Sequence, residues 1–82
     1  MFEVLETREF KRGHKSLRDS RAVARVTVAV ERLQLGLVGD FKSVGSGVSE
    51  IRINYGPGYR LYYTLMGRQL VILLCGGSKS SQ

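Results

Sequence analysis

The sequence contains very little of what metal centres and disulfides require. Among its 82 residues are one cysteine, Cys75, and one histidine, His14. One cysteine excludes an intramolecular disulfide, and these two residues together cannot supply the four ligands of a structural zinc site. We therefore expect no metal and no cofactor, and a domain that is held together by packing alone.

Long apolar runs are also absent. The longest one covers residues 70–75, far below the roughly 18 residues that a membrane-spanning helix needs. Residues 1–6 lack the basic start and the long apolar stretch of a signal peptide. The sequence thus predicts a cytoplasmic protein with no membrane partner.

Several common catalytic patterns are missing as well. There is no glycine-rich phosphate-binding loop of the Walker kind and no serine, histidine and aspartate set with a spare histidine. Paired carboxylates are missing too, because Asp40 and Glu50 each stand alone. Cys75 ends an apolar run and is predicted to be a small core residue. His14 has basic neighbours, which predicts a surface histidine rather than a general base.

The sequence does contain ample apolar material and positive charge. A length of 82 residues, 43% hydrophobic and 24% charged, predicts one small globular domain spanning residues 1–82. The net charge of +6 favours a polyanionic partner or simply a soluble basic surface. Residues 8–25 carry a net charge of +5 in a dense cluster, whereas residues 41–82 carry +4 as single cations among tyrosines and glycines. The second pattern is more typical of a shaped anion site.

The N-terminal part predicts a strand followed by a weak helix. Residues 2–6 mix apolar and acidic side chains and indicate a short strand that ends at Thr7, a residue able to cap a helix. Residues 8–17 follow a helical pattern in which Gly13 costs about 1 kcal/mol relative to alanine. We expect this first helix to be only marginally stable.

A longer apolar stripe predicts the second helix. Its members recur at steps of three and four: Val23, Val26, Val30, Leu33 and Leu37. Residues 26–30 also alternate with a period of two and are rich in β-branched side chains, which favours a strand. Because the stripe continues from a cap at Asp19 or Ser20 to Gly36, we predict a helix.

Beyond the second helix, glycines separate short apolar segments, as in antiparallel sheets. Residues 48–55, 59–65 and 70–75 predict three strands, joined by a turn at 56–58 and a hairpin connection at 66–68. The last strand is apolar on both faces, which is typical of a central or helix-covered strand. The predicted fold is α+β: an N-terminal strand, a helical hairpin, then an antiparallel β-meander of three strands that the helices cover on one side.

The best candidates for chemistry are cations on the predicted sheet: Lys42, Arg52, Arg60 and Lys79, with Tyr55, Tyr62 and Tyr63 nearby in the sequence. Arg52 and Arg60 lie on the polar faces of strands joined by one turn, so we expect them to point the same way. Such a patch can bind phosphate and stack bases on tyrosine. It can also stabilise the charge that develops when an RNA 2′-hydroxyl attacks the neighbouring phosphate. A solvated sheet face without a catalytic role is the alternative interpretation.

Five segments carry a specific family likeness: Leu17-Arg18-Asp19, Ala24-Arg25, residues 39–45, residues 48–63 and residues 73–82. In them the sequence resembles the RelE/ParE superfamily of type II toxin–antitoxin toxins, and most closely its HigB-like addiction module killer branch. The resemblance implies a strand, a helical hairpin and an antiparallel sheet. Relatives continue past Gln82 into a C-terminal helix, so we expect this chain to lack that helix.

The same resemblance implies a function. RelE-like and HigB-like members cleave mRNA in the ribosomal A site without a metal, whereas ParE-like members inhibit DNA gyrase. An antitoxin encoded beside the toxin neutralises both kinds. We therefore expect a ribosome-dependent mRNA endoribonuclease with a cognate antitoxin, a helix-turn-helix protein. The alternatives are a non-enzymatic gyrase inhibitor and a shortened, inactive toxin that only binds its antitoxin.

Roles for single residues also follow from the resemblance. Arg60 resembles the family's phosphate-stabilising arginine, Arg52 a substrate contact or proton-transfer partner, and Lys79 the third basic residue of the catalytic site. Further RNA contacts are expected at Lys42, Tyr55, Arg18, Arg21 and Arg25. The dense cluster of residues 8–25 is expected to form either the solvent face of the helical hairpin or a ribosomal RNA contact.

Overall fold

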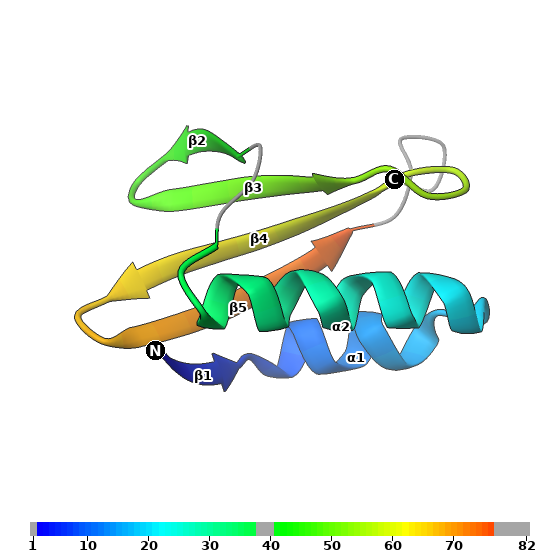
Figure 1. Ribbon diagram of the computed structural model, residues 1–82, viewed down its shortest axis with the longest axis horizontal. Helices are drawn as coiled ribbons and strands as arrows, with labels where there is room; N and C mark the ends of the chain where they lie inside the picture. Colours follow the sequence, from blue (N-terminus) through cyan, green and yellow to red (C-terminus); the bar gives the residue numbers. More distant parts are fainter. Residues whose placement is uncertain (1, 38–40, 77–82) are drawn as a thin grey trace.

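The computed structural model describes residues 2–37 and 41–76, where the chain forms two helices and a five-stranded sheet (Figure 1). The elements in chain order are β1 Glu3–Glu6, α1 Arg8–Ser16, α2 Ser20–Gln34, β2 Phe41–Gly45, β3 Val48–Ile53, β4 Tyr59–Met66 and β5 Gln69–Gly76. Both helices lie on one face of the sheet (Figure 1). The predicted α+β class and the helical hairpin are confirmed. No helix among the described residues is long and apolar enough to cross a membrane.

The sheet is larger than the predicted three-stranded meander. Its spatial order is β1-β5-β4-β3-β2, with β1 parallel to β5 and the other neighbouring pairs antiparallel. The prediction missed β2 because every residue of this edge strand is exposed and the strand shows no apolar alternation. It also assigned the N-terminal strand no partner in the sheet. Parallel pairing of β1 with β5 joins segments more than sixty positions apart, for example Val4 with Leu70, which no local pattern indicates.

Helix α1 is held tightly against β5. The Thr7 side-chain oxygen accepts a hydrogen bond from the Phe10 amide at 3.0 Å, and its hydroxyl donates to the Leu73 carbonyl. Phe10 is 1% exposed and lies in the core. A β-carbon added at Gly13 would stand 3.1 Å from the Cys75 carbonyl oxygen. The glycine that weakens the helix by propensity therefore allows the helix to approach β5 closely.

Helix α2 begins at a side-chain cap and ends at a glycine. The Asp19 carboxylate accepts a hydrogen bond from the Arg21 amide at 2.9 Å. Gly36 has φ of +78°, and the Leu37 amide donates to the Arg32 carbonyl, which closes the helix end. The strand alternative for residues 26–30 is wrong, because Val26 is fully buried within one helical stripe. Leu37 is the exception in the predicted stripe: it lies beyond the helix and is 62% exposed.

The single cysteine and the single histidine differ in how their burial compares with the prediction. Cys75 is buried in the core as predicted, and burial raises the pKa of its thiol. His14 is only partly exposed, so the prediction of a surface histidine is wrong. Its ring stacks on Phe10 with 5.4 Å between the ring centroids, because residues four apart on a helix face the same side. Its Nε2 atom is buried and has no hydrogen-bond partner among the described residues.

The close approach at Gly13 gives a first prediction. Gly13→Val places side-chain atoms against the β5 backbone and is expected to lower the free energy of unfolding by about 1–3 kcal/mol, as overpacked sites do. Lys15→Val is the matched control, since it introduces the same β-branched residue on the exposed side of α1. Urea unfolding followed by circular dichroism compares the two. Equal stabilities would show that α1 has room to move away from β5.

Candidate nucleic-acid interface

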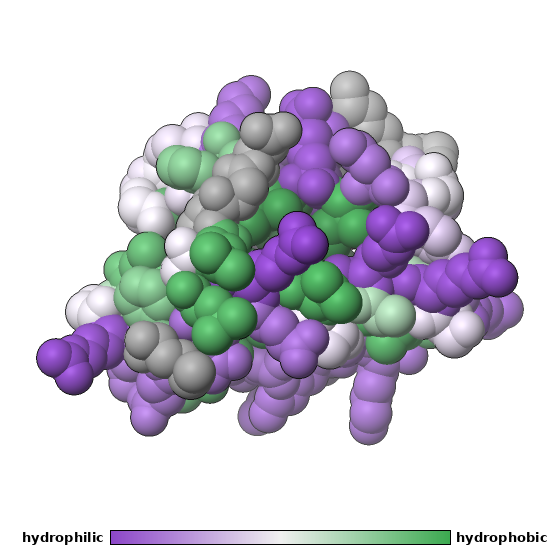
Figure 2. Space-filling model, in the orientation of Figure 1, coloured by the Kyte–Doolittle hydropathy of each residue, from purple (hydrophilic) through white to green (hydrophobic). Residues whose placement is uncertain are grey.

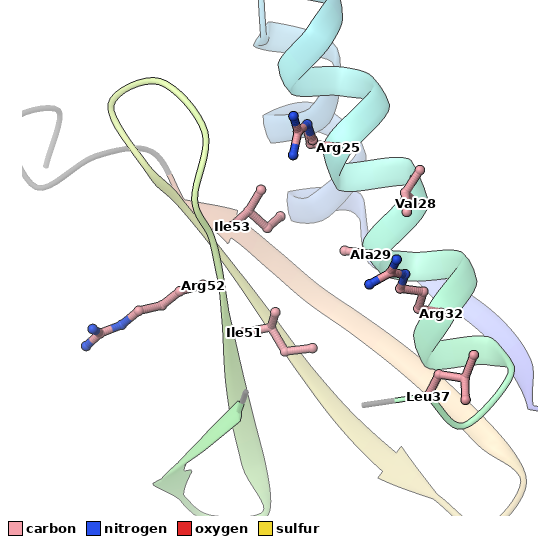
Figure 3. A pocket seen from close by; sticks show the side chains of 8 residues that line it. All are labelled: Arg25, Val28, Ala29, Arg32, Leu37, Ile51, Arg52 and Ile53. Carbon is pink, nitrogen blue, oxygen red and sulfur yellow. The ribbon is translucent and has the colours of Figure 1, made fainter. Parts of the chain in front are cut away.

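The pairing of β3 with β4 places two arginines side by side. Arg52 and Arg60 are directly opposite each other in the antiparallel register, so their side chains leave the same face of the sheet. Ile51 and Ile53 leave the other face, toward α2, while the Arg52 side chain points away from the helix (Figure 3). The expectation that these two arginines point the same way is confirmed. We call the face opposite the helices the arginine face.

A second row of polar side chains crosses the arginine face beside the two arginines. Lys42 of β2 is opposite Glu50 of β3, and Glu50 is opposite Tyr62 of β4. A cavity of about 390 Å³ lies at this point, lined by Phe41, Lys42, Glu50, Arg52 and Asn54. The edge strand β2 thus brings Lys42 next to the arginines. Lys79 lies outside the described residues, and its role stays a prediction.

Glu50 is the residue of this face that sequence reasoning missed. It is 6% exposed, and its Oε1 atom is 3.4 Å from Nε of Arg52, whose side chain is 63% exposed. The sequence showed a lone carboxylate, although its position two residues before Arg52 on a strand already placed both on one face. A nearly buried carboxylate beside a guanidinium can orient that guanidinium and can accept a proton.

Tyr55 and the helix cations form a separate group. The Tyr55 hydroxyl donates a hydrogen bond to Oδ2 of Asp19 at 2.9 Å, and the Arg25 guanidinium stands 5.3 Å from the centroid of the Tyr55 ring. The hydrogen bond from Tyr55 lowers the pKa of Asp19, and the same bond raises the pKa of Tyr55. Arg21 is exposed in the first turn of α2 and Arg18 in the turn before it. Tyr55, which the sequence grouped with the cations of the sheet, therefore lies beside Arg25 and Asp19 of the helical segment.

Between α2 and β3 lies an apolar groove of about 310 Å³ (Figure 3). Val28, Ala29, Leu37, Ile51 and Ile53 supply its apolar walls. Arg25 and Arg32 project from α2 over the opening (Figure 3). Apolar side chains also gather over the end of α2 and the β4–β5 end of the sheet (Figure 2), where the exposed residues are Leu35, Leu37, Leu65 and Met66. Arg52 also lines the cavity, but its side chain points away from α2 (Figure 3). We call the cavity with Arg25 and Arg32 the α2 groove.

Within the described residues no group of three or more histidine, cysteine, aspartate or glutamate side chains could hold a metal ion. The arginine face itself presents cations and one carboxylate. Such groups can bind an anion, stabilise developing negative charge and, at Glu50, transfer a proton.

Residues 10–82 match the family described as Phage derived protein Gp49-like (DUF891). The chain belongs to this family. A protein of Haemophilus influenzae (strain ATCC 51907 / DSM 11121 / KW20 / Rd), described as uncharacterized, is 44% identical over 80 residues. The alignment covers 98% of this Gp49-like chain and 81% of the relative.

Solved structures of toxin–antitoxin systems share the fold of this Gp49-like protein. A chain of the chromosomal ParDE system from P. aeruginosa superimposes with a TM-score of 0.77 at 17% identity, covering 96% of this chain and 98% of that one. The intact E. coli RelBE complex gives the same TM-score and identity, with coverage of 96% and 99%. The YoeB–YefM complex from Staphylococcus aureus gives 0.73 at 18% identity, with coverage of 93% and 95%. The predicted RelE/ParE-like architecture is confirmed.

The hydrogen bond between Tyr55 and Asp19 gives a second prediction. Tyr55→Phe should raise the pKa of the Asp19 carboxyl toward its ordinary value, measured by NMR titration of the side-chain carbonyl carbon. Since the folded-state pKa of Asp19 is lowered, its contribution to stability is present above the unfolded pKa of about 3.9 and is lost as the pH falls through the folded value.

The destabilisation caused by Tyr55→Phe should therefore be present at about pH 7 and shrink once Asp19 becomes protonated. Tyr59→Phe is the control, because the hydrogen bond to Asp19 comes from Tyr55. An unchanged Asp19 titration in Tyr55→Phe would show that the bond does not persist in solution.

Proposed function

We propose that this Gp49-like protein is the toxin of a toxin–antitoxin pair and that it cleaves ribosome-bound mRNA in the cytoplasm without a metal. The observation that carries the proposal is the arginine face, where Arg52 and Arg60 stand opposite each other with Lys42 and Glu50 in the next row. The shared fold supports the toxin assignment, since the similar solved structures come from toxin–antitoxin systems.

The chemistry of this face suits cleavage by the RNA itself. The 2′-oxygen attacks the adjacent phosphorus, the bond from phosphorus to the 5′-oxygen breaks, and negative charge grows on the non-bridging oxygens. Arg52 and Arg60 present guanidinium groups, and their role in the proposal is to stabilise that charge. In the proposal Glu50 accepts the 2′-hydroxyl proton, and the leaving 5′-oxygen takes a proton from solvent. Lys79 stays the predicted third cation of the site.

Loss of a charge-stabilising arginine or of the Glu50 carboxylate should reduce cleavage. Arg60→Ala is expected to reduce cleavage about 10²–10³-fold, the loss typical of one charge-stabilising donor, and Glu50→Gln should reduce it while keeping the shape of the side chain. Inducible expression with mapping of RNA 5′ ends measures both, and the wild type should arrest growth and produce ends at codon boundaries. Arg68→Ala is the control, because Arg68 is exposed in the β4–β5 turn. Intact transcripts during arrest would overturn the nuclease proposal.

A second candidate function is inhibition of DNA gyrase. It is favoured by the likeness to a ParDE structure, which is as close as the likeness to RelBE. In that case the protein would inhibit DNA supercoiling by gyrase in a supercoiling assay, and its expression in cells would leave mRNA uncut. Complex formation with an antitoxin without any growth arrest would instead indicate an inactive chain that only binds its antitoxin.

The α2 groove supports an antitoxin partner. Its apolar walls and its two cations fit an amphipathic segment with acidic residues along one side, because such a segment buries its apolar side chains and neutralises Arg25 and Arg32. Val28 is 46% exposed although it is apolar, which leaves a wall of the groove available to a partner. We place the neutralising segment of the antitoxin here.

Changes in the groove should weaken antitoxin binding. Val28→Asp and Arg32→Glu are each expected to raise the Kd at least about 10-fold, because one puts a charge into the apolar wall and the other repels an acidic segment. Arg68→Glu makes the same charge change on the β4–β5 turn and should leave the Kd unchanged. Titration calorimetry with the product of the neighbouring reading frame measures all three. Equal affinities of the three variants and the wild type would indicate that the antitoxin binds another surface.

A further inference from the structure

Four cations follow one side of α1. Arg8, Lys11, Arg12 and Lys15 recur at steps of three and four residues, and all four are exposed. Phe10 and Gly13, on the opposite side of the helix, pack against the core and β5. Neighbours on such a row are about 5–6 Å apart at their β-carbons, so the charges form one continuous line. We call these four residues the α1 stripe.

The charge of the α1 stripe is not neutralised within the described part of the chain. None of the four cations forms an ion pair with a carboxylate of residues 2–37 or 41–76, where the ion pair present is that of Arg52 with Glu50. Glu6 and Glu9 are the nearby acids in the sequence, and both are exposed. Four clustered cations repel one another, and an anion with several negative charges relieves that repulsion.

A cavity of about 470 Å³ lies along the α1 stripe. It is lined by Glu6, Arg8, Lys11, Arg12, His14 and Lys15. His14 stands between the stripe and Phe10, and its Nε2 atom lacks a hydrogen-bond partner among the described residues. The four cations therefore line one continuous, open surface along α1.

We infer that the α1 stripe binds the phosphate backbone of a double-stranded RNA segment, at a site separate from the arginine face. The inference rests on the proposed function, and it deepens that function by assigning a second RNA contact. The α1 stripe lies on the helix side of the sheet, whereas Lys42, Arg52 and Arg60 leave the other face. Because the two surfaces lie on different sides of the sheet, the inferred contact belongs to a different part of a folded RNA than the strand on the arginine face.

The surroundings of the stripe favour an RNA backbone over other polyanions. An amphipathic helix that binds lipid needs an accessible apolar side, but Phe10 is 1% exposed in the core. A protein partner needs apolar anchors, and the large exposed apolar residues lie elsewhere, over α2 and the strands. The one aromatic ring in the lining, that of His14, already stacks on Phe10, and the lining contains no phenylalanine or tyrosine. A surface made mainly of cations suits duplex phosphates, which are contacted by charge and shape.

The test compares two variants of equal net charge. Lys11→Gln with Lys15→Gln removes two cations of the α1 stripe, and Arg68→Glu makes the same change in net charge on the exposed β4–β5 turn, outside both proposed RNA surfaces. Fluorescence anisotropy with a blunt-ended RNA duplex is measured over a range of salt. The stripe variant should bind at least about 10-fold more weakly, and the slope of log K against log salt should fall by about 2, one for each lost phosphate contact. The other variant should bind as the wild type does.

Three results would overturn the inference. Equal losses in both variants would mean that only net charge matters, and no duplex binding by the wild type would mean that the site is absent. Binding to vesicles of phosphatidylserine and phosphatidylcholine that depends on Lys11 and Lys15, without duplex binding, would indicate a membrane surface instead. The assay uses no cleavage, so it is independent of the Arg60→Ala experiment that tests the nuclease proposal.

Discussion

The backbone pairing of β3 with β4 is the constraint on which the rest of this structure depends. Side chains alternate between the two faces of a strand, so one register decides at the same time what enters the core and what leaves it. Ile51 opposite Leu61 faces the helices, and Arg52 opposite Arg60 faces away from them. A slip of one residue would bury the arginines and expose the isoleucines. The burial of Leu61 thus fixes the direction in which both guanidiniums point.

The two helices meet the sheet in different ways, and each leaves a different surface. Helix α1 lies close to β5 because Gly13 carries no side chain, and it turns its cations outward. Helix α2 buries Ala22, Val26 and Leu33, but Val28 and Leu37 remain exposed beside β3. Close packing at one helix and an apolar groove at the other give a small domain three separate surfaces. The arginine face suits chemistry, the α2 groove suits an apolar and acidic partner, and the α1 stripe suits a polyanion.

Local patterns in the sequence were sufficient to predict a helix or strand where one face of that element is buried. The apolar stripe of α2, the alternation of β3 and β4 and the apolar run of β5 each record a buried side, and all four elements were predicted close to their observed bounds. The same reasoning failed for β2, whose residues are all exposed. It also failed for His14: its basic neighbours in the sequence predicted an exposed ring, but the ring packs on Phe10.

The sequence by itself determined the fold class, the helical hairpin and the shared face of Arg52 and Arg60, because burial and strand alternation are periodic and local. Only the tertiary structure decided which distant groups meet. It paired β1 with β5, brought Lys42 beside Glu50, tied Tyr55 to Asp19 and separated the α1 stripe from the arginine face. These relations depend on strand order and on how the helices pack on the sheet, which no window of neighbouring residues contains.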